Sequence, residues 1–128
     1  ASLIPDKYPK FALGIGTPEH ILRCFDLGWD MFDCVIPTRE GRHGKLFLPK
    51  KGKGKYDFYK TININNAKYK FDFSSINSES SLLELKQYSK SYLHHLFKIR
   101  DPLGLRLASL NNLEFYNNLM SKLKTINY

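Results

Sequence analysis

The sequence predicts an α/β fold whose first part contains two parallel strands joined by a helix. Two short runs, residues 11–16 and 29–37, carry apolar side chains at successive positions, as strands that are buried on both faces do. A stretch with helical spacing lies between them. A strand, a crossover helix and a second strand of this kind form a parallel pair, which is right-handed by default.

The connecting helix has recognisable start and stop signals. Thr17 is a suitable N-cap, and Pro18 stands at the first helical position, where proline is tolerated. Gly28 is expected to end the helix. Its predicted apolar face consists of Ile21, Leu22, Phe25 and Leu27.

The middle of the chain alternates between polar loops and short strands. Residues 38–44 are polar and interrupted by glycine, which predicts a loop, and residues 46–48 could form a short strand. Residues 49–55 form a basic tract expected in an exposed hairpin tip or loop. Residues 56–69 fit one or two short strands, and residues 71–77 look irregular.

Helical spacing returns in the last third of the chain. It spans residues 80–98, and residues 102–104 then mark either a break or a helix start. A final amphipathic helix is predicted over residues 113–126. The side chains expected to face inward are Leu82, Leu85, Tyr88, Tyr92, Leu96 and Phe97 in the first stretch, and Phe115, Tyr116, Leu119, Met120 and Leu123 in the last helix.

The chain of 128 residues has a formal net charge of +8. A basic balance of this size favours a polyanionic partner, nucleic acid first and an anionic membrane second. The alternative is a basic surface that only reflects a Lys-rich coding sequence. A hydrophobic content of 42% excludes a disordered chain. No apolar run approaches the roughly 20 residues that a membrane-spanning helix needs.

The two cysteines, Cys24 and Cys34, lack the paired spacing of metal ligands and imply no disulfide framework. A reducing, cytoplasmic location is therefore expected. The first residue is not Met, so we expect the chain to be part of a longer polypeptide.

One segment carries a specific resemblance. Residues 30–39 read Asp-Met-Phe-Asp-Cys-Val-Ile-Pro-Thr-Arg and are followed by Gly41, Arg42 and Gly44. This pattern resembles the signature of bacterial-type tRNA-guanine transglycosylases, or queuine tRNA-ribosyltransferases. The resemblance continues in order along nearly the whole chain, through residues 13–19, 65–69, 88–89, 92–97, 103–107 and 112–116.

The resemblance implies a fold. The family is a (β/α)8 TIM barrel with a small zinc-binding insertion, and this chain would be its C-terminal portion, with the last two βα units. Residues 1–44 would hold barrel strands seven and eight and an RNA-contacting loop. Residues 45–86 would form a degenerate zinc subdomain, and residues 87–128 the C-terminal helices. Active sites of such barrels lie at the carboxyl ends of the strands.

The resemblance also implies a reaction. The family is a group of pentosyltransferases that exchange guanine at the tRNA wobble position for a 7-deazaguanine precursor of queuosine. Asp33 stands at the position of the catalytic nucleophile, which forms a covalent Asp–ribose intermediate. A lone carboxylate in an apolar strand is costly to bury unless it is paired or functional, and carboxylates do act as nucleophiles at glycosidic carbons. The alternative is an Asp at a strand end that caps a neighbouring helix.

Two segments match the family's contacts to the tRNA anticodon loop. Arg39 and Arg42 suit this role because guanidinium groups grip phosphates and guanine edges in a bidentate manner. The alternative is an exposed loop with ordinary surface charges. Leu13 and Gly14 stand at the base pocket, where Leu13 replaces the Met usual in the family. The remaining predicted RNA contacts are Ile15, Gly16, Thr17, Pro18, Glu19 and His20 in one segment, and Thr38, Glu40 and Gly41 in the other.

The family's zinc ligands are missing. The positions of its Cys-x-Cys-x-x-Cys motif and downstream His hold Ser80, Leu82, Leu85 and Asn111. These side chains make no tetrahedral zinc site, so no metal cofactor is expected. The adjacent pair His94 and His95 is not expected to chelate a metal, because neighbouring helical side chains point about 100° apart.

The resemblance places the family's general acid/base and much of its base pocket before the first residue of this chain. We therefore expect the chain alone to be poorly stable and inactive, and to need the N-terminal barrel portion in cis or in trans. The other expected partners are the tRNA anticodon loop, the 7-deazaguanine base and a possible second copy in a homodimer, with no membrane. The alternative function is a non-catalytic tRNA-binding or accessory paralogue.

Overall fold

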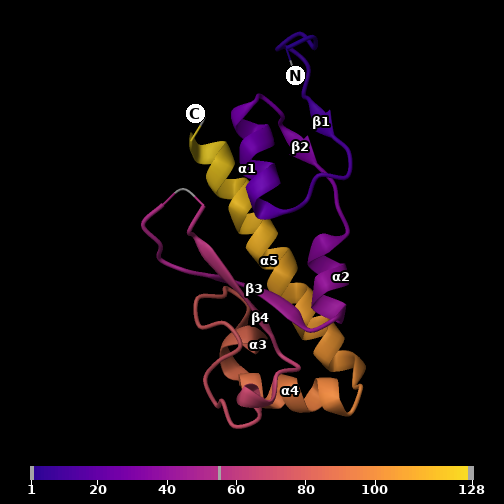
Figure 1. Ribbon diagram of the computed structural model, residues 1–128, viewed down its shortest axis with the longest axis vertical. Helices are drawn as coiled ribbons and strands as arrows, with labels where there is room; N and C mark the ends of the chain where they lie inside the picture. Colours follow the sequence, from indigo (N-terminus) through magenta and orange to yellow (C-terminus); the bar gives the residue numbers. More distant parts are fainter. Residues whose placement is uncertain (1, 55, 127–128) are drawn as a thin grey trace. The chain divides into compact units, whose positions relative to one another are not determined.

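The computed structural model describes residues 2–54 and 56–126, and it has a mixed α/β architecture (Figure 1). The chain divides into two compact units. The first consists of the described residues before Pro37 together with those from Asn118 onward, and the second spans Pro37–Asn117. In the part of the chain that the structure describes, no helix combines the length and hydropathy needed to cross a bilayer.

The first unit contains the predicted strand, helix and strand. Strand β1 (Phe11–Ala12) pairs in parallel with β2 (Met31–Phe32), and α1 (Pro18–Asp26) connects them. The Thr17 side chain accepts the backbone N–H of His20 at 3.3 Å, as an N-cap does. Gly28 follows the helix with φ +85°, a conformation that favours glycine. Parallel pairing and both helix ends are therefore confirmed.

The strands are shorter than predicted. Pairing involves two residues of each strand. The chain turns at Gly14, where φ is +72°, and it enters a helix at Ile36, four residues after the end of β2. Helix α2 (Ile36–Arg42) begins there. The prediction of a strand reaching residue 37, followed by a loop over residues 38–44, is wrong. Pro37 lies in the first turn of α2, where its fixed φ favours a helix.

The second unit begins with a β-hairpin. Strand β3 (Lys45–Pro49) pairs with β4 (Tyr59–Asn63) in an antiparallel register that runs from Lys45–Asn63 to Pro49–Tyr59. The predicted strands at residues 46–48 and within 56–69 are confirmed. The basic tract connects the two strands, and Lys50 forms an ion pair with Asp57 at 2.5 Å. Lys55 of that tract lies outside the described residues.

The single helix predicted over residues 80–98 is two helices. After the 3-10 helix η1 (Ala67–Tyr69), the chain forms α3 (Leu83–Gln87) and α4 (Lys90–Lys98). Tyr88 is extended between them, and its carbonyl accepts the N–H of Ile76 at 2.9 Å. Ser89 then caps α4 by accepting the N–H of Tyr92 at 3.0 Å. The break thus gives the N–H of Ile76 a hydrogen-bond acceptor and lets Ser89 start a new helix.

Residues 102–104 are a helix start. Helix α5 (Pro102–Ile126) runs for 25 residues, and the Asp101 side chain accepts the N–H of Leu103 at 2.8 Å. Arg100, between α4 and α5, has φ +58° and is the one described residue other than glycine with a positive φ. Its N–H donates to Phe97 and the N–H of Asp101 donates to Leu96, which is the hydrogen bonding of a helix C-cap.

The core of the second unit is built around α4, α5 and the hairpin. Tyr88 and Tyr92, which we expected to face inward, are 38% and 37% exposed, whereas Leu93 and His94 are buried. The inward face is shifted because α4 starts anew at Ser89. The buried cluster consists of Leu46, Ile64, Tyr69, Ile76, Leu85, Leu93, Leu96, Leu107 and Ala108.

Candidate functional site

Asp33 directly follows β2 and is exposed, so the expectation of a carboxylate buried inside a strand is wrong. Its Oδ1 accepts the backbone N–H of Gly14 at 2.8 Å. The parallel register brings these residues together, since Phe11 pairs with Met31 and Ala12 with Phe32, and both strands then end on the same side. The carboxylate is thereby oriented at the carboxyl end of two parallel strands, where catalytic groups of α/β proteins gather.

Gly14 and Gly16 have different roles in this arrangement. Gly14 is exposed, and its positive φ lets its N–H turn toward Asp33. Gly16 is buried, and a side chain there would run into Cys34, the neighbour of Asp33. Ile36 Cδ1 would also lie close to this Cβ, at 3.2 Å. The segment after β1 can therefore pack closely against the segment that carries Asp33.

The other residues of the first predicted segment surround this turn. Leu13 is 77% exposed beside Gly14, and His20 is also exposed. Ile15 and Thr17 are half-buried, whereas Pro18 is buried under the start of α1. Glu19, in the first turn of α1, is half-buried. Leu13, Gly14 and His20 are thus the members of this segment that are open to a ligand.

The second predicted segment forms helix α2, in the second unit. Arg39 and Arg42 are exposed. The Glu40 carboxylate lies with Oε1 3.4 Å from Nε of Arg39 and with Oε2 3.5 Å from Nζ of Lys45. Thr38 is half-buried. A helix fixes the two arginines three residues apart on one side, which an irregular loop would not do.

Gly41 is buried where α2 approaches α5. A Cβ on this glycine would lie 3.0 Å from the backbone N and Cα of Ser109, so Gly41 allows the two helices to pack closely. Asn112, which is fully buried, donates to the carbonyl of Pro37 at 2.9 Å at the start of α2. It also donates to Lys45 and accepts from Phe47, both in β3. Asn112 therefore fixes α2 against the hairpin.

Arg42 lines an open pocket of about 440 Å³. Arg100 and the half-buried ring of Phe97 contribute to the same pocket. Two guanidinium groups beside an aromatic ring suit a nucleotide, because arginine binds phosphate and aromatic rings stack on bases. The remaining lining residues are His43, Asn65, Asp101 and Leu105.

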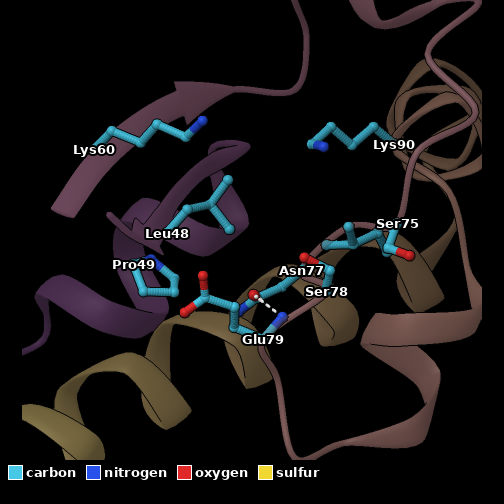
Figure 2. Close-up of a pocket in the computed structure, with 9 residues that line it drawn as sticks. Leu48, Pro49, Lys60, Ser75, Asn77, Ser78, Glu79 and Lys90 are labelled. Carbon is cyan, nitrogen blue, oxygen red and sulfur yellow. Dashed lines mark hydrogen bonds between the residues drawn. The ribbon is translucent and has the colours of Figure 1, made fainter. Parts of the chain in front are cut away.

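A second, more polar pocket of about 190 Å³ lies between the hairpin and the segment before α3 (Figure 2). Figure 2 shows the side chains of Lys60 and Lys90 extending toward each other across it, with Glu79 on the opposite side. Asn77 lies at its edge and accepts the N–H of Glu79 at 3.1 Å. This pocket combines both charge signs and lies outside the predicted site.

The four residues at the family's zinc positions do not fit a metal. Leu82 and Leu85 carry no donor atom, and Leu85 is fully buried in the core cluster. The Ser80 hydroxyl donates to Glu114 at 2.5 Å, and the Asn111 amide is bonded to Asn77 and Phe47. Within residues 2–54 and 56–126, no group of three or more His, Cys, Asp or Glu is arranged to hold a metal ion.

The histidine pair is divided between interior and surface. His94 is 5% exposed, and its Nδ1 lies 2.7 Å from the carbonyl of Ile64, while His95 is exposed.

Asn112 and Arg100 carried no functional prediction. A buried Asn has no local sequence signature, but an Arg at a helix C-cap position, where glycine is usual, is a signal that the sequence could have offered.

The chain is similar to known proteins along nearly its whole length. A family model described as "Queuine tRNA-ribosyltransferase" matches residues 1–126. Proteins named queuine tRNA-ribosyltransferase from Helicobacter pylori strain ATCC 700392 / 26695 and from Clostridium tetani are 46% and 42% identical to the chain over 120 and 124 residues. Another, from Clostridium kluyveri, is 40% identical over 121 residues.

These matches cover 94% to 97% of this chain and 30% to 31% of the relatives. The chain therefore spans about a third of the length of the curated relatives that it matches. The family model covers more than nine-tenths of the chain, and the Asp33 segment and the α2 arginines lie within the match. By these similarities, the chain belongs to the queuine tRNA-ribosyltransferase family.

Proposed function

We propose that this chain is the C-terminal part of a tRNA-guanine transglycosylase, which exchanges guanine at the tRNA wobble position for a 7-deazaguanine. The observation that carries the proposal is the oriented carboxylate of Asp33, with its Oδ1 held 2.8 Å from the Gly14 nitrogen. One carboxylate oxygen accepts this hydrogen bond, and the other is left to react. The family membership supports the same assignment.

In the proposed reaction, a carboxylate oxygen of Asp33 attacks C1′ of the wobble ribose. The bond between C1′ and the guanine nitrogen breaks, and guanine leaves with the bonding electron pair and takes a proton from a general acid. The incoming 7-deazaguanine then gives the proton of its ring N–H back to the same acid/base group, and this nitrogen displaces the Asp33 carboxylate from C1′. The general acid belongs to the part of the enzyme outside this chain.

Substrate binding is assigned to the two predicted segments. Arg39 and Arg42 bind the anticodon loop, and the pocket that Arg42 shares with Arg100 and Phe97 accepts a nucleotide of that loop. Leu13 and Gly14 line the base pocket. The remaining residues of both segments hold these groups in position, because most of them are half-buried or buried.

The fold of the complete enzyme follows from the same proposal. We assign β1 and β2 to the last two strands of a (β/α)8 barrel, within residues 1–44. Residues 45–86 are assigned to the degenerate zinc insertion and residues 87–128 to the C-terminal helices. Each of these strands has two paired residues, and Phe11 and Met31 remain 48% and 43% exposed. The N-terminal barrel portion, in cis or in trans, would cover them. The proposal places the enzyme in the cytoplasm and includes a homodimer among its assemblies.

The alternative is a non-catalytic tRNA-binding or accessory paralogue. The replacement of all four zinc-ligand positions favours it, since the family's zinc region supports tRNA binding and dimerisation. Both functions predict tRNA binding that weakens steeply with salt, but the covalent intermediate belongs to the enzyme alone.

The test is to trap the covalent intermediate. The protein that contains the whole chain is incubated with tRNA carrying guanine at the wobble position, and the denatured mixture is analysed for a protein–tRNA adduct. We expect an adduct from the wild-type protein and none from Asp33→Asn, with exchange of labelled guanine reduced at least about 1,000-fold.

Asp30→Asn is the matched control. Asp30 also accepts a backbone N–H from the β1 segment, that of Lys10 at 2.8 Å, so Asp30→Asn removes a carboxylate charge from the same kind of hydrogen bond near the same strands. We expect adduct formation to persist in this variant. Salt-sensitive tRNA binding with no adduct from the wild-type protein would instead support the accessory function.

A further inference from the structure

The segment that the family fastens with zinc is held in this chain by a carboxylate on α5. Oε2 of Glu114 accepts the Ser80 hydroxyl at 2.5 Å. Its Oε1 accepts both the backbone N–H of Ser81, at 2.7 Å, and the Ser81 hydroxyl, at 2.5 Å. The N–H of Leu82 in turn donates to the Ser80 hydroxyl at 3.0 Å. One side chain therefore organises three consecutive residues, at the point where the family has its first two cysteines.

A second connection lies at the position of the family's histidine. Asn111 is fully buried, and its Oδ1 accepts the side-chain N–H of Asn77 at 3.1 Å. The Asn111 amide donates in the other direction to the carbonyl of Phe47 at 2.9 Å. Asn77 itself accepts the N–H of Glu79, the bond drawn in Figure 2, and its own N–H donates to the carbonyl of Leu85. The amide pair thus connects the segment to both α5 and β3.

The third cysteine position has become part of the hydrophobic core. Leu85 has no exposed surface and belongs to the cluster that includes Ile76 and Leu93. Leu82 packs against the same cluster. Apolar burial of this kind contributes stability that does not depend on an ion. A metal would need these two positions to supply donor atoms, which leucine lacks.

We infer that residues 77–85 are fastened to α5 by a metal-independent clamp, in which Glu114 and Asn111 replace the zinc ion of the family. The clamp consists of Ser80, Ser81 and Asn77 on the segment and Glu114 and Asn111 on the helix. The polar groups of these five residues form hydrogen bonds with one another. Their donors and acceptors are therefore satisfied without a metal ion. This inference does not depend on the catalytic assignment of Asp33.

The test combines metal content with stability. The protein that contains the whole chain is purified without added metal, its zinc is measured by mass spectrometry, and its melting temperature is recorded with and without EDTA. We expect substoichiometric zinc and no shift of the melting temperature on chelation. Stoichiometric zinc, or a fall of several degrees with EDTA, would overturn the inference.

The clamp itself is tested by Glu114→Gln, which retains the shape of the side chain but removes its charge and one acceptor. We expect the melting temperature to fall by several degrees, and the amide N–H groups of Ser81 and Leu82 to exchange faster with solvent. Glu84→Gln is the control, since Glu84 is an exposed carboxylate in the same region, at the start of α3.

If Glu114→Gln prevents folding, Ser81→Ala removes one hydroxyl bond and supplies the same exchange measurement. A melting temperature and exchange rates that match those of Glu84→Gln would show that Glu114 does not stabilise the segment, and would contradict the proposed clamp. None of these readouts requires transglycosylase activity, so failure of the clamp and failure of the proposed reaction are separate results.

Discussion

The two small sheets of this molecule are built to very different degrees. Strands β3 and β4 form five residue pairs, and β3 buries Leu46, Phe47 and Leu48. Strands β1 and β2 form two pairs, and of their four residues only Ala12 is buried. The β3–β4 sheet is completed by residues of its own unit, whereas the β1–β2 sheet leaves apolar side chains exposed. The exposed carboxylate of Asp33 and the exposed apolar side chains of this sheet are the features on which the proposed assignment to a barrel rests.

Buried polar groups account for part of the difference. The ring of Phe47 stacks on Phe115 with centroids 5.5 Å apart, and its backbone N–H donates to Asn112 at 3.0 Å. The β3–β4 hairpin is thus held by both apolar and polar contacts to α5. The β1–β2 pair has its polar contacts at the margins, where Asp30 and Asp33 accept N–H groups of Lys10 and Gly14.

The largest expected effect comes from Asn112→Leu. Leucine has a similar volume but leaves the N–H of Phe47 and the carbonyls of Pro37 and Lys45 without their partner, in the interior. We expect the free energy of unfolding to fall by about 3 kcal/mol or more. Chemical denaturation measures this, with Asn117→Leu, at an exposed position of α5, as the control. Equal losses in the free energy of unfolding for the two substitutions would mean that the hydrogen bonds of Asn112 do not stabilise the β3–β4 sheet.

Gly16→Ala tests the other sheet. The new methyl group would collide with the Cys34 side chain, and we expect a cost of about 1–3 kcal/mol. The loss should be local, so amide exchange at Met31, whose N–H donates to Lys10, should accelerate while β3 is unaffected. Gly54→Ala is the control, because no atom lies within 4 Å of the place that its new methyl group would occupy. Unchanged exchange at Met31 would refute the close packing.

Arg100→Gly is expected to stabilise the second unit and so to increase the difference in stability between the two units. Arg100 adopts φ +58° at the end of α4, and glycine takes this conformation without a steric penalty. We expect a gain of about 1 kcal/mol in a denaturation curve. The same variant should bind tRNA more weakly, because the pocket next to Arg42 loses a guanidinium group. Lys98→Gly, an exposed position within α4, should be destabilising instead.

The smallest effect concerns pH. Partial burial alone would raise the pKa of Glu114, but hydrogen bonds from Ser80 and Ser81 outweigh it and hold this pKa below its ordinary value of 4.5. The charged clamp therefore stabilises the fold fully above the unfolded-state pKa, and this contribution is lost as the pH falls through the lower folded-state pKa. We expect less than about 1 kcal/mol, since Glu114 is partly exposed to solvent. Melting curves at stepped pH should show the decline in the wild-type protein and a flatter profile in Glu114→Gln.

Local signals allowed much of the fold to be predicted. The capping Thr17, the following Pro18 and Gly28 fix α1 through contacts within a few residues, and parallel pairing followed from the apolar runs on either side. Helix α2 was missed because its support is distant. Gly41 lowers the helix propensity of the sequence. In the structure, however, it permits close contact with Ser109, which is far away in the sequence.

The candidate site was predicted in identity but not in geometry. Asp33 and the arginines of α2 came from the family resemblance, and their roles remain predictions. The hydrogen bond between Asp33 and Gly14 joins residues 19 positions apart through the register of two strands, which apolar patterning does not specify. The break at Tyr88 was invisible for a similar reason, since its carbonyl bonds to Ile76 outside the helix.

The clamp also has a consequence for the timing of folding. Ser80 and Glu114 are separated by 34 residues, and Asn77 and Asn111 by the same number. During synthesis from the N-terminus, residues 77–85 emerge well before their partners on α5, so the segment cannot be fastened until most of the chain has been made. In the proposed clamp, α5 is the last component that the segment requires. Maturation of this region would then be limited by translation and helix formation, and would be independent of the supply of zinc in the cell.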